Sequence, residues 1–150
     1  MLLLGAIGVV ALLLYRHGRR RDPMFLATAA IGGVVLDLVV RVAFGHVRPD
    51  LPFPYSLLGR DGLPSGHALD ATVCYGAVLI ALWPQLSRTR KLVATSATAV
   101  LVAGVSYSRV VLLNHYLSDV LAGITLGLTW LLLVAAAFSL PRRDRLPSAT

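Results

Sequence analysis

Five long apolar stretches, separated by short polar segments, constrain this chain more than any other feature of its sequence. They lie at residues 2–15, 24–44, 68–83, 92–107 and 116–140. A helix needs roughly 20 mostly apolar residues to cross the hydrocarbon core of a bilayer, and it satisfies its own backbone hydrogen bonds there. The sequence therefore predicts an all-α fold, a polytopic membrane bundle of about five transmembrane helices.

The composition agrees with this prediction and limits the other classes of protein. Hydrophobic residues make up 57% of the chain and charged residues only 14%, well below the share of about 25% in soluble domains. The one cysteine, Cys74, cannot form an intramolecular disulfide, and no Cys/His cluster has zinc-ligand spacing. We expect a single membrane domain over residues 1–150, without a metal or other cofactor, ending in a short cytoplasmic tail at 141–150.

The excess of positive charge follows the ends of the apolar stretches. The net charge is +7, from 14 Lys and Arg against seven Asp and no Glu. Ten basic residues form three clusters after the first, third and fifth stretches: Arg16, Arg19, Arg20 and Arg21; Arg88, Arg90 and Lys91; Arg142, Arg143 and Arg145. Because basic residues gather on the cytoplasmic side of membrane proteins, these clusters indicate topology and not a nucleic-acid partner. Topology does not explain the other four, which fall on the extracytoplasmic side: Arg41, Arg48, Arg60 and Arg109.

Arg41 and Arg48 stand at the end of the second stretch, in the segment RVAFGHVRP, where Pro49 ends the helix. The planar guanidinium offers several donors that suit phosphate oxygens. The alternative is that Arg41 pairs with Asp37, four residues earlier, and that Arg48 lies among lipid headgroups. Taken alone, this segment favours the alternative.

The segment LPSGH precedes the third stretch. Ser65 and Gly66 at a helix start leave backbone N–H groups and the positive end of the helix dipole open to an anion, and His67 lies in the first turn beside them. The alternative is an ordinary helix cap with a histidine at the membrane interface. A motif this short indicates an anion site without establishing one.

The third polar group lies in SRVVLLNHYLSD, Ser108 to Asp119. If a helix begins near Asn114, His115 and Asp119 lie four residues apart on one face, where the carboxylate can accept a hydrogen bond from the imidazole. Such a carboxylate holds a histidine in one tautomer and leaves its other nitrogen to act as a nucleophile. The alternative, a His–Asp pair that satisfies itself inside a bundle, does not explain why Arg109 shares the same side.

Small residues recur in the fifth stretch. Gly123 and Gly127 are the first and last residues of the segment GITLG, four residues apart and therefore on one helix face. This spacing predicts close packing of that helix, with its His–Asp face pressed against its neighbours.

Taken in order, R-x6-RP (Arg41 to Pro49), PSGH (Pro64 to His67) and SR-x5-H-x3-D (Ser108 to Asp119) resemble the three-part signature of the PAP2 superfamily. This is the family of type 2 phosphatidic acid phosphatases, which also includes bacterial lipid-diphosphate phosphatases and the vanadium haloperoxidases. The order, spacing and shared side of the three motifs are far more specific than any one of them.

The resemblance implies a role for each motif residue, and the chemistry of the family needs no metal. His115 would be the nucleophile that forms a phosphohistidine, Asp119 would orient it, and His67 would protonate the leaving oxygen and later assist water. Five residues would bind the phosphoryl oxygens: Arg41, Arg48, Arg109, Ser65 and, through its backbone N–H, Gly66.

The chain departs from the family pattern at two points. The family usually has lysine where Arg41 stands, a difference that keeps the charge but changes the geometry. Its membrane members commonly have six helices, whereas five helices and a cytoplasmic C-terminus would put this N-terminus outside. We expect either a compact five-helix member or a chain that lacks an upstream segment.

The resemblance and the charges together predict an integral membrane phosphatase of the cell membrane, with its active site on the extracytoplasmic side and a lipid phosphate or diphosphate as substrate. An isoprenoid diphosphate such as undecaprenyl diphosphate is the first expected substrate, and phosphatidate or phosphatidylglycerophosphate is the next. The alternative is a non-catalytic protein that binds or transports a lipid phosphate, in which the same charges line a path. Replacing His115 separates the two, because only turnover depends on it.

Overall fold

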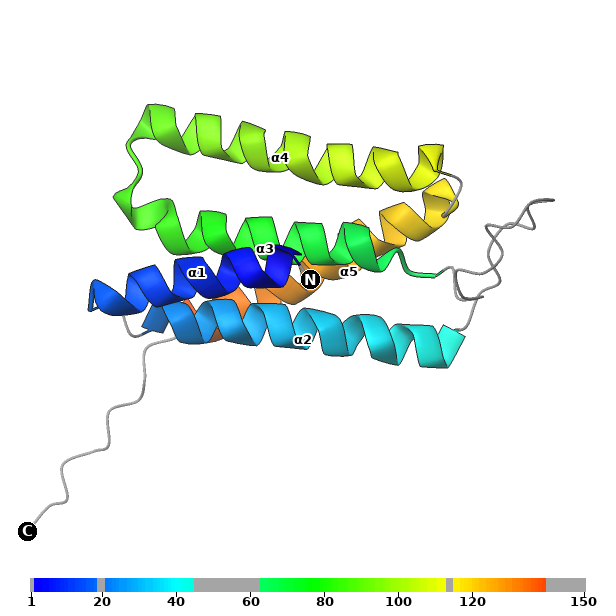
Figure 1. Ribbon diagram of the computed structural model, residues 1–150, viewed down its shortest axis with the longest axis horizontal. Helices are drawn as coiled ribbons and strands as arrows, with labels where there is room; N and C mark the ends of the chain where they lie inside the picture. The colour runs from blue at the N-terminus through cyan, green and yellow to red at the C-terminus, as the bar shows by residue number, and fades with distance from the viewer. Residues whose placement is uncertain (1, 19–20, 45–62, 113–114, 140–150) are drawn as a thin grey trace, which may run out of the picture.

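The protein folds into a bundle of α-helices (Figure 1). The computed structural model describes residues 2–18, 21–44, 63–112 and 115–139. In this part of the chain the helices are α1 (Leu2–Arg16), α2 (Arg21–Phe44), α3 (Gly66–Leu82), α4 (Arg88–Val111) and α5 (Leu117–Ser139), and a short 3₁₀ helix, η2 (Trp83–Gln85), follows α3. The predicted all-α bundle of five helices is confirmed, and the tail at 141–150 lies outside the described residues.

Four of these helices are long and apolar enough to cross a membrane: α2, α4, α5 and the continuous run Gly66–Gln85 that α3 makes with η2. The first helix, α1, has 15 residues. That length gives about 22 Å of helix against a hydrocarbon core of about 30 Å. Four of the five predicted spans therefore have the necessary length, and the described part of α1 is a shorter apolar helix.

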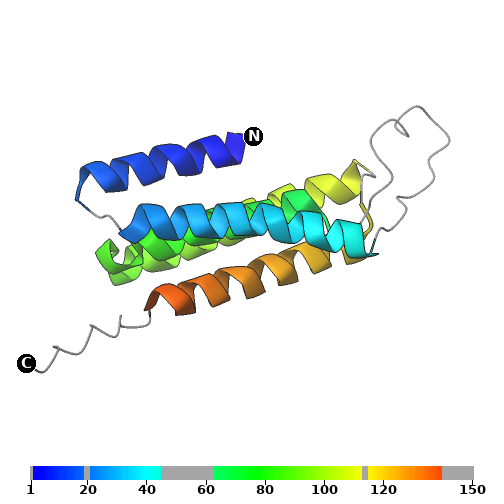
Figure 2. The ribbon, with the colours of Figure 1, turned by 90° about the horizontal axis from the view of Figure 1, so that it is seen from below.

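The central helix of the bundle is α3, which packs against α1, α2, α4 and α5 (Figures 1 and 2). Its side chains Leu69 and Val73 are almost completely buried. The closest approach is that of α5, where a Cβ on Gly123 would stand 2.6 Å from the carbonyl oxygen of Ser65, and one on Gly127 would stand 3.1 Å from that of Leu69. The predicted close packing through this glycine pair is confirmed.

In contrast, α4 lies at the edge of the bundle and packs mainly against α3. Ser106 is its only buried side chain. Large apolar side chains on its outer surface, Leu92, Val100 and Tyr107, are each at least 70% exposed. A helix with this pattern suits an environment of lipid rather than water.

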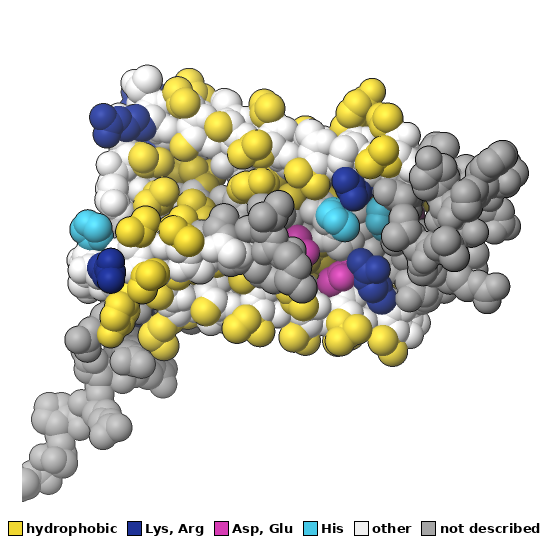
Figure 3. Space-filling model, in the orientation of Figure 1, with side chains coloured by type: hydrophobic (Ala, Val, Ile, Leu, Met, Phe, Trp, Pro, Cys, Tyr) yellow, Lys and Arg dark blue, Asp and Glu magenta, His cyan; other side chains and the backbone are white. Residues whose placement is uncertain are grey.

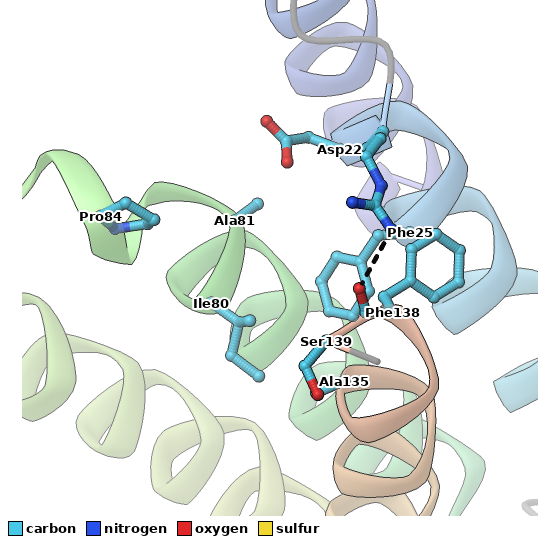
Figure 4. A pocket seen from close by; sticks show the side chains of 9 residues that line it. Asp22, Phe25, Ile80, Ala81, Pro84, Ala135, Phe138 and Ser139 are labelled. Atoms are coloured by element: carbon cyan, nitrogen blue, oxygen red, sulfur yellow. Dashed lines mark hydrogen bonds between the residues drawn. The ribbon is translucent and has the colours of Figure 1, made fainter. Parts of the chain in front are cut away.

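The two ends of the bundle carry different charges. One end, where α1 and α3 finish and α2 and α4 begin, holds the described members of the first two basic clusters: Arg16, Arg21, Arg88, Arg90 and Lys91. There the guanidinium Nη2 of Arg21 donates to the carbonyl oxygen of Phe138 (3.5 Å), and the Phe25 and Phe138 rings meet edge to face at 5.6 Å (Figure 4). Arg41 and Arg109 lie in the last turns of α2 and α4, at the opposite end.

Candidate active site

The segment PSGH forms the N-terminus of α3. Ser65 is the N-cap residue, with φ −73° and ψ 100°, and the helix begins at Gly66. The Ser65 side chain is fully buried and caps no backbone N–H, and its Oγ has no hydrogen-bond partner among the described residues. His67 lies exposed in the first turn. This helix end therefore offers an unused hydroxyl together with N–H groups that have no acceptor within the helix.

A backbone hydrogen bond joins this N-terminus to α5. The Ser65 N–H donates to the carbonyl oxygen of Asp119 over 2.9 Å. One turn further along α5, the close approach at Gly123 keeps the two helices near enough for this bond. Two motifs far apart in sequence are thus held together by main-chain atoms, and only a displacement of α5 relative to α3 would separate them.

His115 and Asp119 are buried together, at 5% and 1% exposure. The imidazole Nδ1 lies 3.7 Å from the carboxylate Oδ2, which is an ion-pair distance and longer than a hydrogen bond. Hydrogen bonds at active sites often lengthen in this way and shorten when a substrate binds. The predicted pairing of the two side chains is confirmed, but the hydrogen bond expected between them is not formed.

The helix that follows begins later than predicted, at Leu117. Asp119 itself accounts for this start, because its Oδ2 accepts a hydrogen bond from the Tyr116 N–H (2.9 Å), as in one arm of a capping box. His115 therefore precedes the helix, and its N–H donates to the carbonyl oxygen of Arg109 (3.3 Å). The prediction that the pair stacks on one face of α5 is wrong, and the turn before the helix brings the two residues together instead.

Arg109 is half-buried in the last turn of α4. Its Nε donates to Ser108 Oγ (3.2 Å), which in turn donates to the carbonyl oxygen of Val105 (2.7 Å). Since its backbone carbonyl accepts the His115 N–H, this residue ties the end of α4 to the histidine. Anchoring through Nε leaves the two terminal nitrogens for a ligand.

Arg41 is anchored in the same way on α2. Its Nε donates to Asp37 Oδ2 over 2.9 Å, and the two side chains are 26% and 20% exposed. The pairing that the spacing suggested is therefore confirmed. A Cβ on Gly66 would stand 2.5 Å from Arg41 Nη2 and 2.9 Å from Asp37 Oδ2. Because Asp37 occupies Nε while Nη2 lies over the start of α3, pairing with Asp37 and binding an anion are compatible.

Asp37 thus belongs to the site, although the sequence presents it only as the alternative partner of Arg41. A carboxylate in an apolar helix, four residues before an arginine, is the signal that marks it, since ionisable residues inside membrane segments are costly and usually have a function. This signal identifies Asp37 and Arg41 as a pair but does not predict that they lie over Gly66. Only the packing of α2 on α3 determines that position.

Seven of the eight predicted site residues are described, and all seven lie at one end of the bundle: Arg41, Ser65, Gly66, His67, Arg109, His115 and Asp119. Arg48 falls outside the described residues. Figure 3 shows histidine, basic and acidic side chains gathered toward this end on one face. Among the described residues no three His, Cys, Asp or Glu side chains are placed to hold a metal ion, and metal independence stays a prediction.

If Arg41 binds phosphate, as the resemblance implies, Gly66→Ala is expected to weaken the binding of inorganic phosphate about ten- to a hundredfold, the effect of losing one hydrogen bond to a charged group. The new methyl group would displace Arg41 Nη2 while the backbone N–H of residue 66 remains. Inhibition of turnover by phosphate measures the change. In an Arg41→Ala background the same replacement should add little, because both act through one guanidinium; additive losses would contradict this account.

Known proteins carry the same pattern. A sequence profile described as the PAP2 superfamily matches residues 22–143, which is more than three quarters of the chain and includes all three motifs. The chain belongs to the PAP2 superfamily. The resemblance drawn from the three motifs is thereby confirmed.

Individual curated relatives match shorter parts of the chain. Phosphatidylglycerophosphatase B of Bacillus subtilis is 35% identical over 103 residues, 67% of this chain and 50% of the relative. A lipoprotein signal peptidase of Cupriavidus taiwanensis is 38% identical over 79 residues, 53% of this chain and 43% of the relative. The chain spans about half the length of the curated relatives it matches. No solved structure matches it.

Proposed function

We propose that this PAP2 protein is an integral membrane phosphatase that removes phosphate from a lipid phosphate or diphosphate through a phosphohistidine at His115. The observation that carries the proposal is the hydrogen bond between the Ser65 N–H and the Asp119 carbonyl oxygen. It sets a helix N-terminus suited to an anion beside a buried His–Asp pair. A phosphoryl group held at the start of α3 would therefore lie next to a nucleophile.

The reaction would take place in two displacements. Asp119 lies on the Nδ1 side of His115, so Nε2 attacks phosphorus. The N–P bond forms while the P–O bond to the leaving group breaks, and His67 gives a proton to the departing oxygen. Water then attacks the phosphoryl group and passes a proton to His67, and the N–P bond breaks to release inorganic phosphate. One acid–base residue serves both displacements.

Fixed positive groups would stabilise the charge on the transferring phosphoryl group. Arg41 and Arg109 each keep terminal nitrogens for its oxygens, and Ser65 Oγ and the first-turn N–H groups complete the cradle; we expect Arg48 to join them. Phosphoryl transfer depends mostly on positioning and electrostatic stabilisation. These groups would supply both without a metal ion.

The active site would face the extracytoplasmic side of the plasma membrane. The described members of the basic clusters lie at the other end of the bundle, and such residues gather on the cytoplasmic side. At the outer surface, a lipid headgroup could reach the site while its hydrocarbon chains stay in the bilayer.

An isoprenoid diphosphate such as undecaprenyl diphosphate remains our first candidate substrate. The similarity to phosphatidylglycerophosphatase B favours phosphatidylglycerophosphate, and phosphatidate presents the same phosphomonoester chemistry. All three lipids present a phosphoryl group at the membrane surface. The seven described site residues suit that phosphoryl group and do not distinguish the lipids by their hydrocarbon chains.

Two other functions are less well supported. A protein that only binds or transports a lipid phosphate has no evident need for a buried His–Asp pair beside a second histidine. A peptidase is suggested by the name of the Cupriavidus taiwanensis relative, and two carboxylates, Asp37 and Asp70, interact electrostatically between α2 and α3. However, Asp37 is hydrogen-bonded to Arg41, and the helix N-terminus beside the buried pair His115 and Asp119 suits a phosphoryl group.

Phosphate release from proteoliposomes tests the proposal. The substrates are undecaprenyl diphosphate, phosphatidate and phosphatidylglycerophosphate, each with and without EDTA, and a lipid-modified peptide is assayed for cleavage in parallel. We expect release from at least one lipid, unaffected by EDTA and greatly reduced in His67→Ala, because the leaving oxygen then lacks its acid. Loss of release in EDTA, or peptide cleavage without phosphate release, would contradict the proposal.

A further inference from the structure

An apolar groove of about 380 Å³ opens on the side of the bundle between α1, α3 and α4. Its lining includes Ile7 of α1, Cys74 and Leu82 of α3, and Ala97 and Leu101 of α4, and none of its described lining residues is charged. Figure 3 shows hydrophobic side chains over these helices, on the same face as the polar residues gathered toward the active-site end. The groove has the size and apolar lining of a ligand site rather than of a packing defect.

We propose that this groove holds a hydrocarbon chain of the lipid whose phosphate binds at the start of α3, an inference that rests on the proposed function. The same two helices line both sites. Cys74 follows Gly66 by eight residues on α3, and Leu101 precedes Arg109 by eight residues on α4. At 1.5 Å per residue the groove begins about 12 Å from the phosphate-binding groups along both helices. That interval accommodates the ester linkage and the first carbons of a chain.

The depth of the groove fits a long chain. Its far end at Leu86 is 20 residues beyond Gly66, or about 30 Å along α3 and η2. The hydrocarbon core of a bilayer is also about 30 Å thick, so the groove begins about 12 Å from the phosphate-binding groups and continues toward the opposite end of the bundle. A chain of only a few carbons would not reach it, whereas a long alkyl or isoprenoid chain would.

The lining of the groove suits a hydrocarbon chain, because all twelve side chains that form it are uncharged and most of them are apolar. A single hydrocarbon chain needs no hydrogen-bond partners and follows a narrow apolar channel, which is what this lining provides.

A tryptophan in the groove tests the proposal by kinetics. Ala97→Trp is expected to raise KM for hexadecyl phosphate roughly tenfold, about the effect of two lost methylene contacts, and to leave KM for butyl phosphate unchanged. Ala99→Trp, on the same helix but outside the groove lining, is the matched control and should change neither KM. No rise for the long substrate, or an equal rise for both substrates, would overturn the proposal.

Photo-crosslinking gives a second test that does not need turnover. Hexadecyl phosphate with a diazirine in the distal half of its chain, bound to the protein in nanodiscs, is expected to label the segments around Cys74 and Ala97. The corresponding alcohol, which lacks the phosphate, should instead label lipid-facing residues such as Val39 of α2. Equal labelling of all faces by the hexadecyl phosphate probe would overturn the proposal that the groove holds its chain. Groove labelling without any phosphate release would support the groove and refute the phosphatase.

Discussion

Replacing His115 by alanine is expected to lower the rate of phosphate release by a factor on the order of 10³ to 10⁶, as when other enzymes lose their nucleophile. The side chain is 5% exposed and is held between the end of α4 and Asp119. Water from bulk solvent therefore cannot readily take its place as the nucleophile. Binding of a lipid phosphate should survive, because Arg41, Arg109 and Ser65 are unchanged. Phosphate release and equilibrium binding in nanodiscs, measured on the same preparation, separate the two effects.

The matched control for this variant is His17→Ala. His17 is exposed near the end of α1, where its Nδ1 lies 2.7 Å from the carbonyl oxygen of Leu13. Its replacement should leave phosphate release unchanged. Turnover that persists in His115→Ala would remove this residue as the nucleophile, and intact binding without turnover would exclude a purely structural role.

Gly123→Ala is expected to damage both stability and activity. The new methyl carbon would stand 2.6 Å from the carbonyl oxygen of Ser65, a backbone atom that cannot rotate away. Relieving the clash pushes α5 from α3, at a cost of about 1–3 kcal/mol in the free energy of unfolding. It also lengthens the bond from the Ser65 N–H to Asp119. Displacing catalytic groups by about 1 Å can lower the rate about a hundredfold.

Denaturant unfolding in detergent and kcat for the preferred lipid measure the two parts of this prediction. Gly104→Ala is the control, because a Cβ at Gly104 on α4 would meet nothing within 4 Å. Alanine there should leave activity unchanged and stabilise the helix by up to about 1 kcal/mol. If both variants behaved alike, the close α3–α5 contact would have no part in forming the site.

The sequence predicted the helices well because apolar length is a local property that each segment carries by itself. It was less accurate at helix ends, where single hydrogen bonds decide the start. The Asp119 carboxylate takes the Tyr116 N–H and starts α5 at Leu117, which leaves His115 outside the helix. Periodicity along the chain describes residues within a helix and says little about the turn that precedes it.

By itself, the sequence determined the class of fold, the end of the bundle that carries the site, and the motif residues found there. Hydropathy, basic clusters and motif spacing are all read along the chain, so they needed no tertiary contacts. Only the tertiary structure decided that the Ser65 N–H meets the Asp119 carbonyl oxygen, that Arg41 lies over Gly66, and that α1, α3 and α4 leave a groove. These contacts join residues far apart in sequence, and they depend on how closely the helices approach. That approach is set by packing at glycines such as Gly123, where the absence of a side chain lets two backbones touch.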